Sequence, residues 1–275
     1  MRRKTTYRLL IGATAAALAV SAAPGAAAGK AAKGWNEPVL ISDRQAARET
    51  SIVINPKNEK EMLVCDPSGV PATGNGQSYF FRTVDGGRKW HYVDVETATT
   101  DTRSYAFEGG DCDVAYDDGG TTWTADTWAG NLSVGHSRDG VTWSGTAVAA
   151  SAPVVDRPWI VGGRPGELFV TYHDAQCCMP GVLWFTKTTD YGATWRPAVP
   201  VTTGDHRGAF LWEGNLVVAP GGRDLHVVYS RQPAPTVVRA GQAIPTTIAL
   251  ATSRDGGASW SSRDVAVLPT STSSL

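Results

Sequence analysis

Four acidic residues stand at the same position relative to a short apolar run. Each begins the pattern acid-x-x-apolar-x-apolar, and together they are Glu49, Asp111, Asp156 and Glu213. Carboxylates that converge can divide the work of glycoside cleavage, because repulsion between like charges raises the pKa of one acid while another stays ionised. We therefore predict that these four acids are the catalytic candidates of the chain.

Further charged residues lie beside these acids or at the ends of later apolar runs. They are Arg48, Arg157, His173, Asp174 and Arg231. A guanidinium binds a sugar carboxylate through two hydrogen bonds, and a histidine beside an aspartate can transfer a proton. These residues are our candidates for substrate binding. The alternative is that each acid caps a turn and pairs with a neighbouring arginine, which would only stabilise the scaffold.

Acids and cysteines also bear on metal binding. The acids Asp111, Asp113, Asp117 and Asp118 offer the oxygen ligands that calcium prefers, although acid-rich turns occur without a metal too. The four cysteines are Cys65, Cys112, Cys177 and Cys178, which match no zinc-binding spacing and allow three disulfide pairings. We predict structural cysteines, no cofactor and no metal site, with calcium as the alternative.

The first 28 residues have the features of an export signal. A basic start precedes an apolar stretch over residues 9–20, and Ala26 and Ala28 form a small-residue cleavage site. Removing this segment leaves 21 basic and 26 acidic residues, a net charge of −5. An acidic secreted chain without a basic run is a poor candidate for binding nucleic acid or a membrane. We expect a secreted monomer that binds a glycan or another small polar ligand.

The elements that would position these residues follow from a repeat. Residues 83–90, 188–195 and 253–260 fit the pattern S/T-x-D-x-G-x-x-W, and residues 137–143 form a copy one residue shorter. The aspartates of the four copies are Asp85, Asp139, Asp190 and Asp255. Such an aspartate accepts bonds from turn amides, and glycine supplies a backbone conformation that other residues avoid. We predict structural turns, each followed by a tryptophan that packs between layers.

The repeat predicts an all-β propeller of four-stranded blades, with these turns between the third and fourth strands. The aspartates are 54, 51 and 65 residues apart, which is the length of a propeller blade. In the third unit we expect strands over residues 159–161, 167–172, 182–187 and 195–201. Four complete blades are visible, which predicts a small, open or truncated propeller. A linker over 29–34 would precede the domain at 35–268, and a polar tail over 269–275 would follow it.

Strand direction alternates within a blade, so the blade predicts which residues share a face. Starts of first strands and ends of second strands meet at one face, and the aspartate turns lie at the other. All candidate catalytic and substrate-binding residues fall on the first face.

The aspartate turns, with Glu49-Thr-Ser-Ile-Val-Ile-Asn-Pro and Asp156-Arg-Pro-Trp-Ile, resemble those of secreted bacterial proteins of the sialidase superfamily, also called BNR-repeat or Asp-box proteins. The resemblance implies six blades, an arginine triad, a Tyr and Glu pair as nucleophile and an aspartate as acid/base. This sequence has no Arg-Ile-Pro or Arg-Leu-Pro element near its N-terminus. Two functions are therefore open: a sialidase-like glycoside hydrolase acting on terminal sugars, or a non-catalytic propeller that binds glycans or proteins.

Overall fold

The computed structural model describes residues 37–42, 49–67, 78–93, 95, 111–128, 131–148, 155–174, 181–207, 209–232 and 245–268. Internal contacts divide the chain into the units Met1–Leu40 and Ile41–Leu275, and every strand among the described residues lies in the second unit. Arg48, Cys177, Cys178, the predicted export signal and the polar tail lie outside the described residues. In the parts of the chain that are described, no helix is long and apolar enough to cross a membrane.

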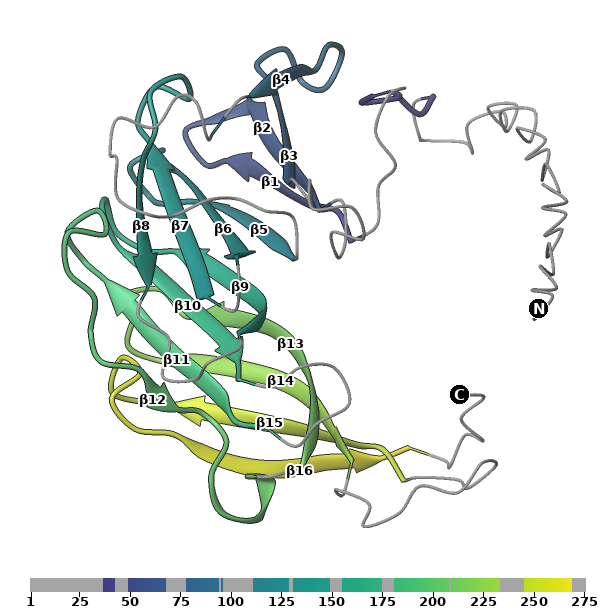
Figure 1. Ribbon diagram of the computed structural model, residues 1–275, viewed down its shortest axis with the longest axis vertical. Coiled ribbons are helices and arrows are strands. Elements are labelled where there is room, and N and C mark those ends of the chain that lie inside the picture. The colour runs from purple at the N-terminus through teal and green to yellow at the C-terminus, as the bar shows by residue number, and fades with distance from the viewer. Residues whose placement is uncertain are drawn as a thin grey trace, which may run out of the picture. The chain divides into compact units, whose positions relative to one another are not determined.

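The second unit is built of four antiparallel sheets, each with four strands in sequence order from one edge to the other (Figure 1). Blade 1 contains β1 (Ser51–Asn55), β2 (Asn58–Pro67), β3 (Ser78–Thr83) and β4 (His91–Val93). Blade 2 contains β5 (Cys112–Tyr116), β6 (Thr122–Trp128), β7 (Asn131–Ser137) and β8 (Ser144–Val148). Blade 3 contains β9 (Asp156–Gly162), β10 (Leu168–His173), β11 (Leu183–Thr188) and β12 (Val199–Pro200), and the 3-10 turn η1 (Gly204–His206) follows. Blade 4 contains β13 (Phe210–Val218), β14 (Leu225–Gln232), β15 (Thr247–Ser253) and β16 (Ser261–Val267). The predicted all-β propeller with four-stranded blades is confirmed.

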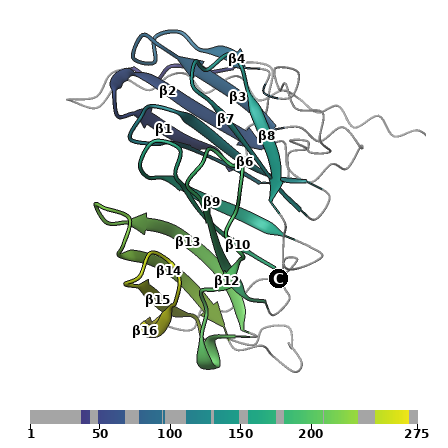
Figure 2. The ribbon, with the colours of Figure 1, turned by 90° about the vertical axis from the view of Figure 1, so that its left-hand side faces the viewer.

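The hydrophobic core lies between the blades. The first strands contact one another in succession, β1 with β5, β5 with β9 and β9 with β13, and both ribbon views show each sheet beside the next (Figures 1 and 2). One cluster of buried side chains joins each neighbouring pair of blades. The repeat tryptophans Trp143, Trp195 and Trp260 pack into these three clusters.

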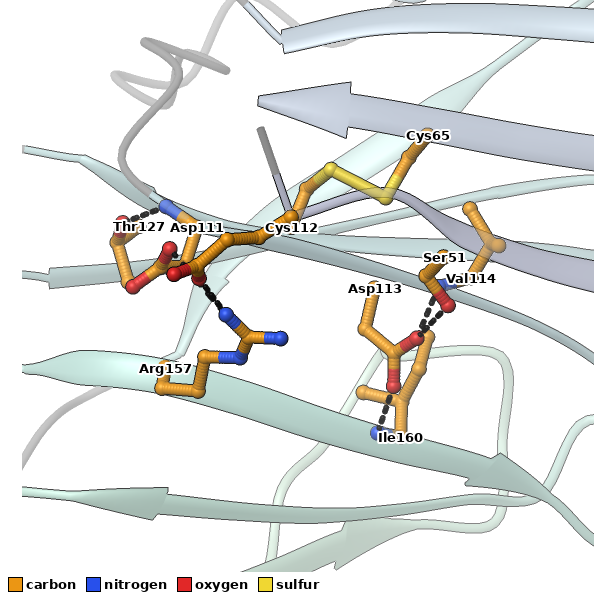
Figure 3. The surroundings of a disulfide bond; sticks show 10 residues. Ser51, Cys65, Asp111, Cys112, Asp113, Val114, Thr127, Arg157 and Ile160 are labelled. Carbon is orange, nitrogen blue, oxygen red and sulfur yellow. Dashed lines mark hydrogen bonds and ion pairs between the residues drawn. A yellow bond between two sulfur atoms is a disulfide. The ribbon is translucent and has the colours of Figure 1, made fainter. Parts of the chain in front are cut away.

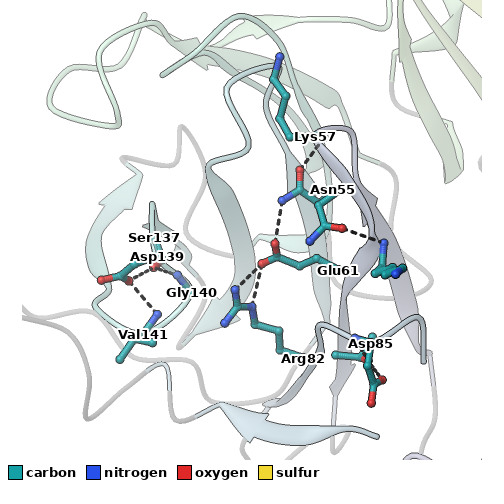
Figure 4. A network of polar contacts seen from close by, with 12 residues as sticks. Asn55, Lys57, Glu61, Arg82, Asp85, Ser137, Asp139, Gly140 and Val141 are labelled. Atoms are coloured by element: carbon teal, nitrogen blue, oxygen red, sulfur yellow. Dashed lines mark hydrogen bonds and ion pairs between the residues drawn. The ribbon is translucent and has the colours of Figure 1, made fainter. Parts of the chain in front are cut away.

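The aspartate turns connect the third strand to the fourth in every blade. In blade 2, the Asp139 Oδ1 accepts hydrogen bonds from the Val141 N–H at 2.8 Å and the Thr142 N–H at 2.7 Å (Figure 4). The Ser137 hydroxyl donates to the same oxygen at 3.0 Å and accepts the Gly140 N–H at 2.8 Å. Gly140 has a φ of 69°, in the left-handed region that favours glycine.

Strand boundaries differ from the expectation in blades 3 and 4. In blade 3 the first strand, β9, covers Asp156–Gly162 instead of 159–161. The fourth strand of blade 3 is only Val199–Pro200 instead of 195–201, because Pro197 and Pro200 have no N–H to donate to a ladder. In blade 4 the first strand begins at Phe210, so that Glu213 lies inside β13 instead of before it. The apolar residues Phe210 and Leu211 continue the pairing with β14, and a bulge follows between Glu213 and Leu216.

A disulfide joins Cys65 of β2 to Cys112 of β5 and therefore links blade 1 to blade 2. Cys65 is fully buried and Cys112 is 3% exposed, so the bond lies in the core between the blades. The sequence left three pairings open, and this is the one that the described residues form.

Candidate functional site

Three charged residues from three blades converge at the face where the first strands begin. Arg157 of β9 forms an ion pair through Nη1 with Oε2 of Glu49, which lies just before β1. The same Nη1 is 3.7 Å from Oδ1 of Asp111, which lies just before β5 (Figure 3). We call Glu49, Asp111 and Arg157 the Arg157 cluster. Three of the nine predicted catalytic and substrate-binding residues thus meet.

The Arg157 cluster is open to solvent. Its side chains are 25% exposed for Arg157, 53% for Glu49 and 22% for Asp111. A ligand can therefore reach both carboxylates and the guanidinium. A cation between two anions suits recognition of a polar or acidic sugar, and the carboxylates provide groups that can give or take a proton.

Arg157 is held in an uncommon backbone conformation. Its φ is 41°, a value that non-glycine residues rarely adopt and that is found disproportionately at functional sites. Its guanidinium lies 4.9 Å from the centre of the Trp159 ring, within the range of a cation–π contact. This indole was not among the predicted site residues, because it reads as an ordinary core residue of a strand.

Asp111 is fixed by its neighbours on the same blade. Its N–H donates to the Thr127 hydroxyl at 2.8 Å, and its carbonyl accepts the Thr127 N–H at 3.1 Å. The next residue, Cys112, forms the disulfide to blade 1. The carboxylate of Asp111 is thus carried by backbone that is anchored on two sides.

Asp113 follows Asp111 by two residues, on β5, and is only 6% exposed. Its Oδ1 accepts the Ser51 hydroxyl at 2.5 Å and the Val114 N–H at 2.9 Å, and its Oδ2 accepts the Ile160 N–H at 2.9 Å. Burial disfavours the charged form and raises the pKa of Asp113 to about 6, and these hydrogen bonds oppose the shift.

Other predicted residues have different surroundings. Both oxygens of Asp174 accept hydrogen bonds within its own blade, from the Val182 N–H at 2.6 Å and the Trp184 indole N–H at 2.7 Å. His173 is 7% exposed and pairs in register with Asp156 of β9. The side chains of Asp156 and Glu213 are not described.

Arg231 of β14 binds the carboxylate of Asp264 with two hydrogen bonds, at 2.9 and 2.7 Å. Asp264 lies on β16, at the opposite edge of the sheet from β13. This hydrogen bonding holds the pKa of Arg231 above, and that of Asp264 below, its usual range. Arg231 is thus engaged at the outer side of blade 4.

The four repeat aspartates serve the turns at the other face. Hydrogen bonds to the Thr142 amide and to the Ser259 hydroxyl are the largest causes that lower the pKa of Asp139 and of Asp255, each to about 2. Amide and hydroxyl donors also lower the pKa values of Asp85 and Asp190. These donors belong to the turns themselves, which is what a structural role requires.

Among the described residues, no group of three or more His, Cys, Asp or Glu side chains is placed to hold a metal ion. Asp117, one of the acids considered for calcium, is fully buried. Its Oδ1 accepts the N–H groups of Gly119 and Thr121, both at 2.9 Å, and its Oδ2 accepts the Gly166 N–H at 2.8 Å. Asp113 and Asp117 therefore use their oxygens to connect backbone segments.

No protein-family model and no curated protein matches the chain. Solved structures match its fold. The α-L-arabinofuranosidase of Fusarium graminearum, in complex with an iminosugar inhibitor, is 17% identical, with a TM-score of 0.53 over 83% of this chain and 68% of that one. The same organism's GH93 α-L-arabinofuranosidase with arabinobiose is 18% identical, with a TM-score of 0.54 and the same coverage.

The α-L-arabinanase of Penicillium chrysogenum, complexed with arabinobiose, is 16% identical, with a TM-score of 0.55 over 79% of this chain and 66% of that one. The chain thus spans about two thirds of the length of these enzymes. They are arabinose-directed enzymes and not the sialidases that the aspartate turns suggested. At these identities the likeness establishes a β-propeller fold that the chain shares with sugar-cleaving enzymes.

Proposed function

We propose that the chain is a β-propeller glycoside hydrolase that acts on terminal sugars of glycans, with the Arg157 cluster as its substrate site. The observation that carries this proposal is that one arginine contacts two carboxylates supplied by two other blades. The fold shared with arabinose-directed enzymes supports glycan cleavage, and the resemblance of the aspartate turns supports a sialidase-like member. Sialidase-like activity requires the arginine to bind a sugar carboxylate.

The charges of the cluster suggest how it would work. In the free protein Arg157 is the shared ion-pair partner of both Glu49 and Asp111. When a sugar carboxylate or hydroxyl takes the guanidinium, one protein carboxylate loses part of this partner and becomes free to bind a proton. That acid can then protonate the leaving group, while the other remains ionised as base or nucleophile.

The second candidate function is glycan binding without cleavage. It is favoured by the ion pairing itself, because an arginine that neutralises two carboxylates is also what a scaffold or a lectin-like site would contain. Both candidates use the same face and the same residues, so turnover is the property that separates them.

We further propose that the protein is exported, with residues 1–28 removed. The sequence of the leader and the buried disulfide between Cys65 and Cys112 support an oxidising compartment. Mass spectrometry of the protein recovered from culture medium tests this: a start at residue 29 is expected, and retention of the leader would contradict export by cleavage.

The test of function is a panel of aryl glycosides that includes an α-sialoside, an α-L-arabinofuranoside and a β-galactoside, with Asp111→Asn, Glu49→Gln and Arg157→Lys variants. We expect turnover of at least one sugar, a loss of two or more orders of magnitude in kcat for a carboxylate variant, and a rise in KM for Arg157→Lys. Turnover that survives in all three variants would place the site elsewhere. Binding on a glycan array without turnover, lost in Arg157→Lys, would establish the second candidate.

A further inference from the structure

We propose that Asp113 is a positioning residue of this site: its buried carboxylate fixes, relative to one another, the strand β9, which carries Arg157, and the strands β1 and β5, which Glu49 and Asp111 precede. The inference rests on the proposed function for its consequence in catalysis. Its structural part concerns the Arg157 cluster itself and can be tested without a substrate.

The hydrogen bonds of Asp113 reach a different blade on each side (Figure 3). Ser51 of β1 donates to it from blade 1, and the amide of Ile160 of β9 donates from blade 3. Asp113 itself belongs to β5 of blade 2, and its own Oδ1 also accepts the Val114 amide. One side chain therefore connects the first strands of three consecutive blades.

These donors lie close in sequence to the members of the Arg157 cluster. Ser51 follows Glu49 by two residues, Asp113 follows Asp111 by two, and Ile160 follows Arg157 by three. Glu49 and Asp111 precede their strands, and Arg157 lies at an irregularity in the pairing of β9 with β10, so each is linked to its donor by two or three residues of covalent backbone. A displacement of the donor's backbone is passed along so short a segment, because the peptide units are planar and only φ and ψ can absorb it. A shift of β9 relative to β5 would therefore move the Arg157 guanidinium relative to Asp111.

The disulfide does not duplicate this function. It ties Cys112 to Cys65, and Cys65 pairs in register with Ser51, so it fixes blade 2 only against blade 1. The hydrogen bond from the Ile160 amide to Asp113, unlike the disulfide, reaches blade 3, where Arg157 lies. Removal of the Asp113 carboxylate should therefore affect the arginine more than the distance between Glu49 and Asp111.

The chain contains a matched control at the other end of the same strand. Asp117 directly follows β5, is fully buried, and likewise accepts an amide of blade 3, the Gly166 N–H at 2.8 Å. It lies at the face of the aspartate turns and also accepts the amides of Gly119 and Thr121 in its own blade, whereas Asp113 also accepts a hydrogen bond from blade 1. Asp113→Asn and Asp117→Asn therefore both remove a buried carboxylate that joins blades 2 and 3, but only the first does so beside the Arg157 cluster.

The experiment compares these two variants in the full mature chain by the NMR resonance of the Arg157 side-chain Nε–H, assigned with Arg157→Lys. We expect Asp113→Asn to shift this resonance in the direction that Glu49→Gln or Asp111→Asn shifts it, and Asp117→Asn to leave it in place. On any glycoside that the protein cleaves, Asp113→Asn should raise KM at least tenfold, whereas Asp117→Asn should leave KM within twofold.

An Arg157 resonance unchanged in Asp113→Asn would overturn the proposal, as would equal shifts in the two variants. If Asp113→Asn fails to fold, Asp113→Glu replaces it, since that change keeps a carboxylate but moves its oxygens by one methylene group relative to the Ile160 amide of blade 3; an unshifted Arg157 resonance there would equally overturn the proposal. If no glycoside is cleaved by the unaltered protein, the proposed hydrolase fails, while the resonance still decides whether Asp113 positions the arginine.

Discussion

At the scale of single residues, the buried carboxyl of Asp113 should make the stability of the protein depend on pH. Its pKa in the folded protein is raised to about 6, above the ordinary value of 3.8, so the folded state holds this proton more tightly than the unfolded chain. Its contribution to stability is therefore full below about pH 4 and is lost as the pH rises through 6. A difference of about two pKa units between the folded and unfolded states corresponds to roughly 3 kcal/mol of unfolding free energy.

The measurement is the free energy of unfolding in urea between pH 4 and 7, for the unaltered protein and for Asp113→Asn. The difference between the two proteins should change by about 2–3 kcal/mol over this range, with the unaltered protein losing stability relative to the variant as pH rises. The aspartates with lowered pKa, such as Asp139, are common to both proteins and cancel. A difference independent of pH would show that Asp113 titrates normally.

At the scale of elements, the glycines of two aspartate turns separate backbone strain from side-chain contact. Gly86 and Gly140 directly follow the aspartates of blades 1 and 2 and have φ values of 77° and 69°. A Cβ on Gly86 would meet nothing within 4 Å, whereas one on Gly140 would lie 2.6 Å from the guanidinium carbon of Arg82. Arg82 cannot simply swing away, because Glu61 holds it with bonds of 2.8 and 2.5 Å (Figure 4).

We therefore expect Gly86→Ala to lower the free energy of unfolding by about 1–2 kcal/mol, the cost of a left-handed conformation for alanine. Gly140→Ala should lower the free energy of unfolding further, because Arg82 of blade 1 must also move away from the new Cβ in blade 2. Thermal or urea unfolding of both variants checks this. Equal losses would mean that Arg82 contributes nothing at that turn.

The disulfide is the other device that acts between elements. It closes a loop with a sequence separation of 47 residues between β2 and β5. A Cys65→Ala, Cys112→Ala double variant should lose about 2–4 kcal/mol of unfolding free energy, since the unfolded chain gains freedom. The addition of a reductant should destabilise the unaltered protein and leave the variant unchanged; sensitivity of the variant would point to a second redox-active group.

The repeat predicted the strands because each aspartate turn, glycine and tryptophan recurs with its blade, and local chemistry suffices to define such a turn. It missed the short β12 and the early start of β13, where prolines and extra apolar residues override the repeat. The sequence predicted only that Arg157 and Glu49 lie on the same face of the propeller. It could not predict their contact, because the distance between them depends on how three blades pack.

Asp113 illustrates what the sequence could not disclose. Its partners Ser51 and Ile160 are 62 and 47 residues away, and neither a serine in a strand nor a backbone amide has a recognisable motif. The acid-x-acid pattern at Asp111 and Asp113 left calcium binding open as an alternative, whereas the packed blades supply hydroxyl and amide donors to the second acid. Only the packing between blades distinguishes these two uses of a carboxylate.

At the scale of the whole molecule, the position of the core between sheets predicts how the protein unfolds. Phe185 of β11 is 2% exposed. The centre of its ring lies 6.3 Å from that of Phe169 in its own blade and 5.3 Å from that of Trp260 in blade 4. Leu216 and Val227 of blade 4 belong to the same buried cluster. Blades 3 and 4 therefore share one core and should lose protection together.

We expect Phe185→Ala to cost about 3–5 kcal/mol and to speed amide hydrogen exchange in β10 and β11 and, equally, in β14 and β15. Val228→Ala on β14 is the control, because that side chain is 47% exposed and its removal should change little. Exchange measured by mass spectrometry resolves the two blades. Faster exchange confined to blade 3 would mean that each sheet is stable by itself. Faster exchange in both blades would show that a blade is ordered by its neighbour. A site built from three blades keeps its geometry only under this second condition.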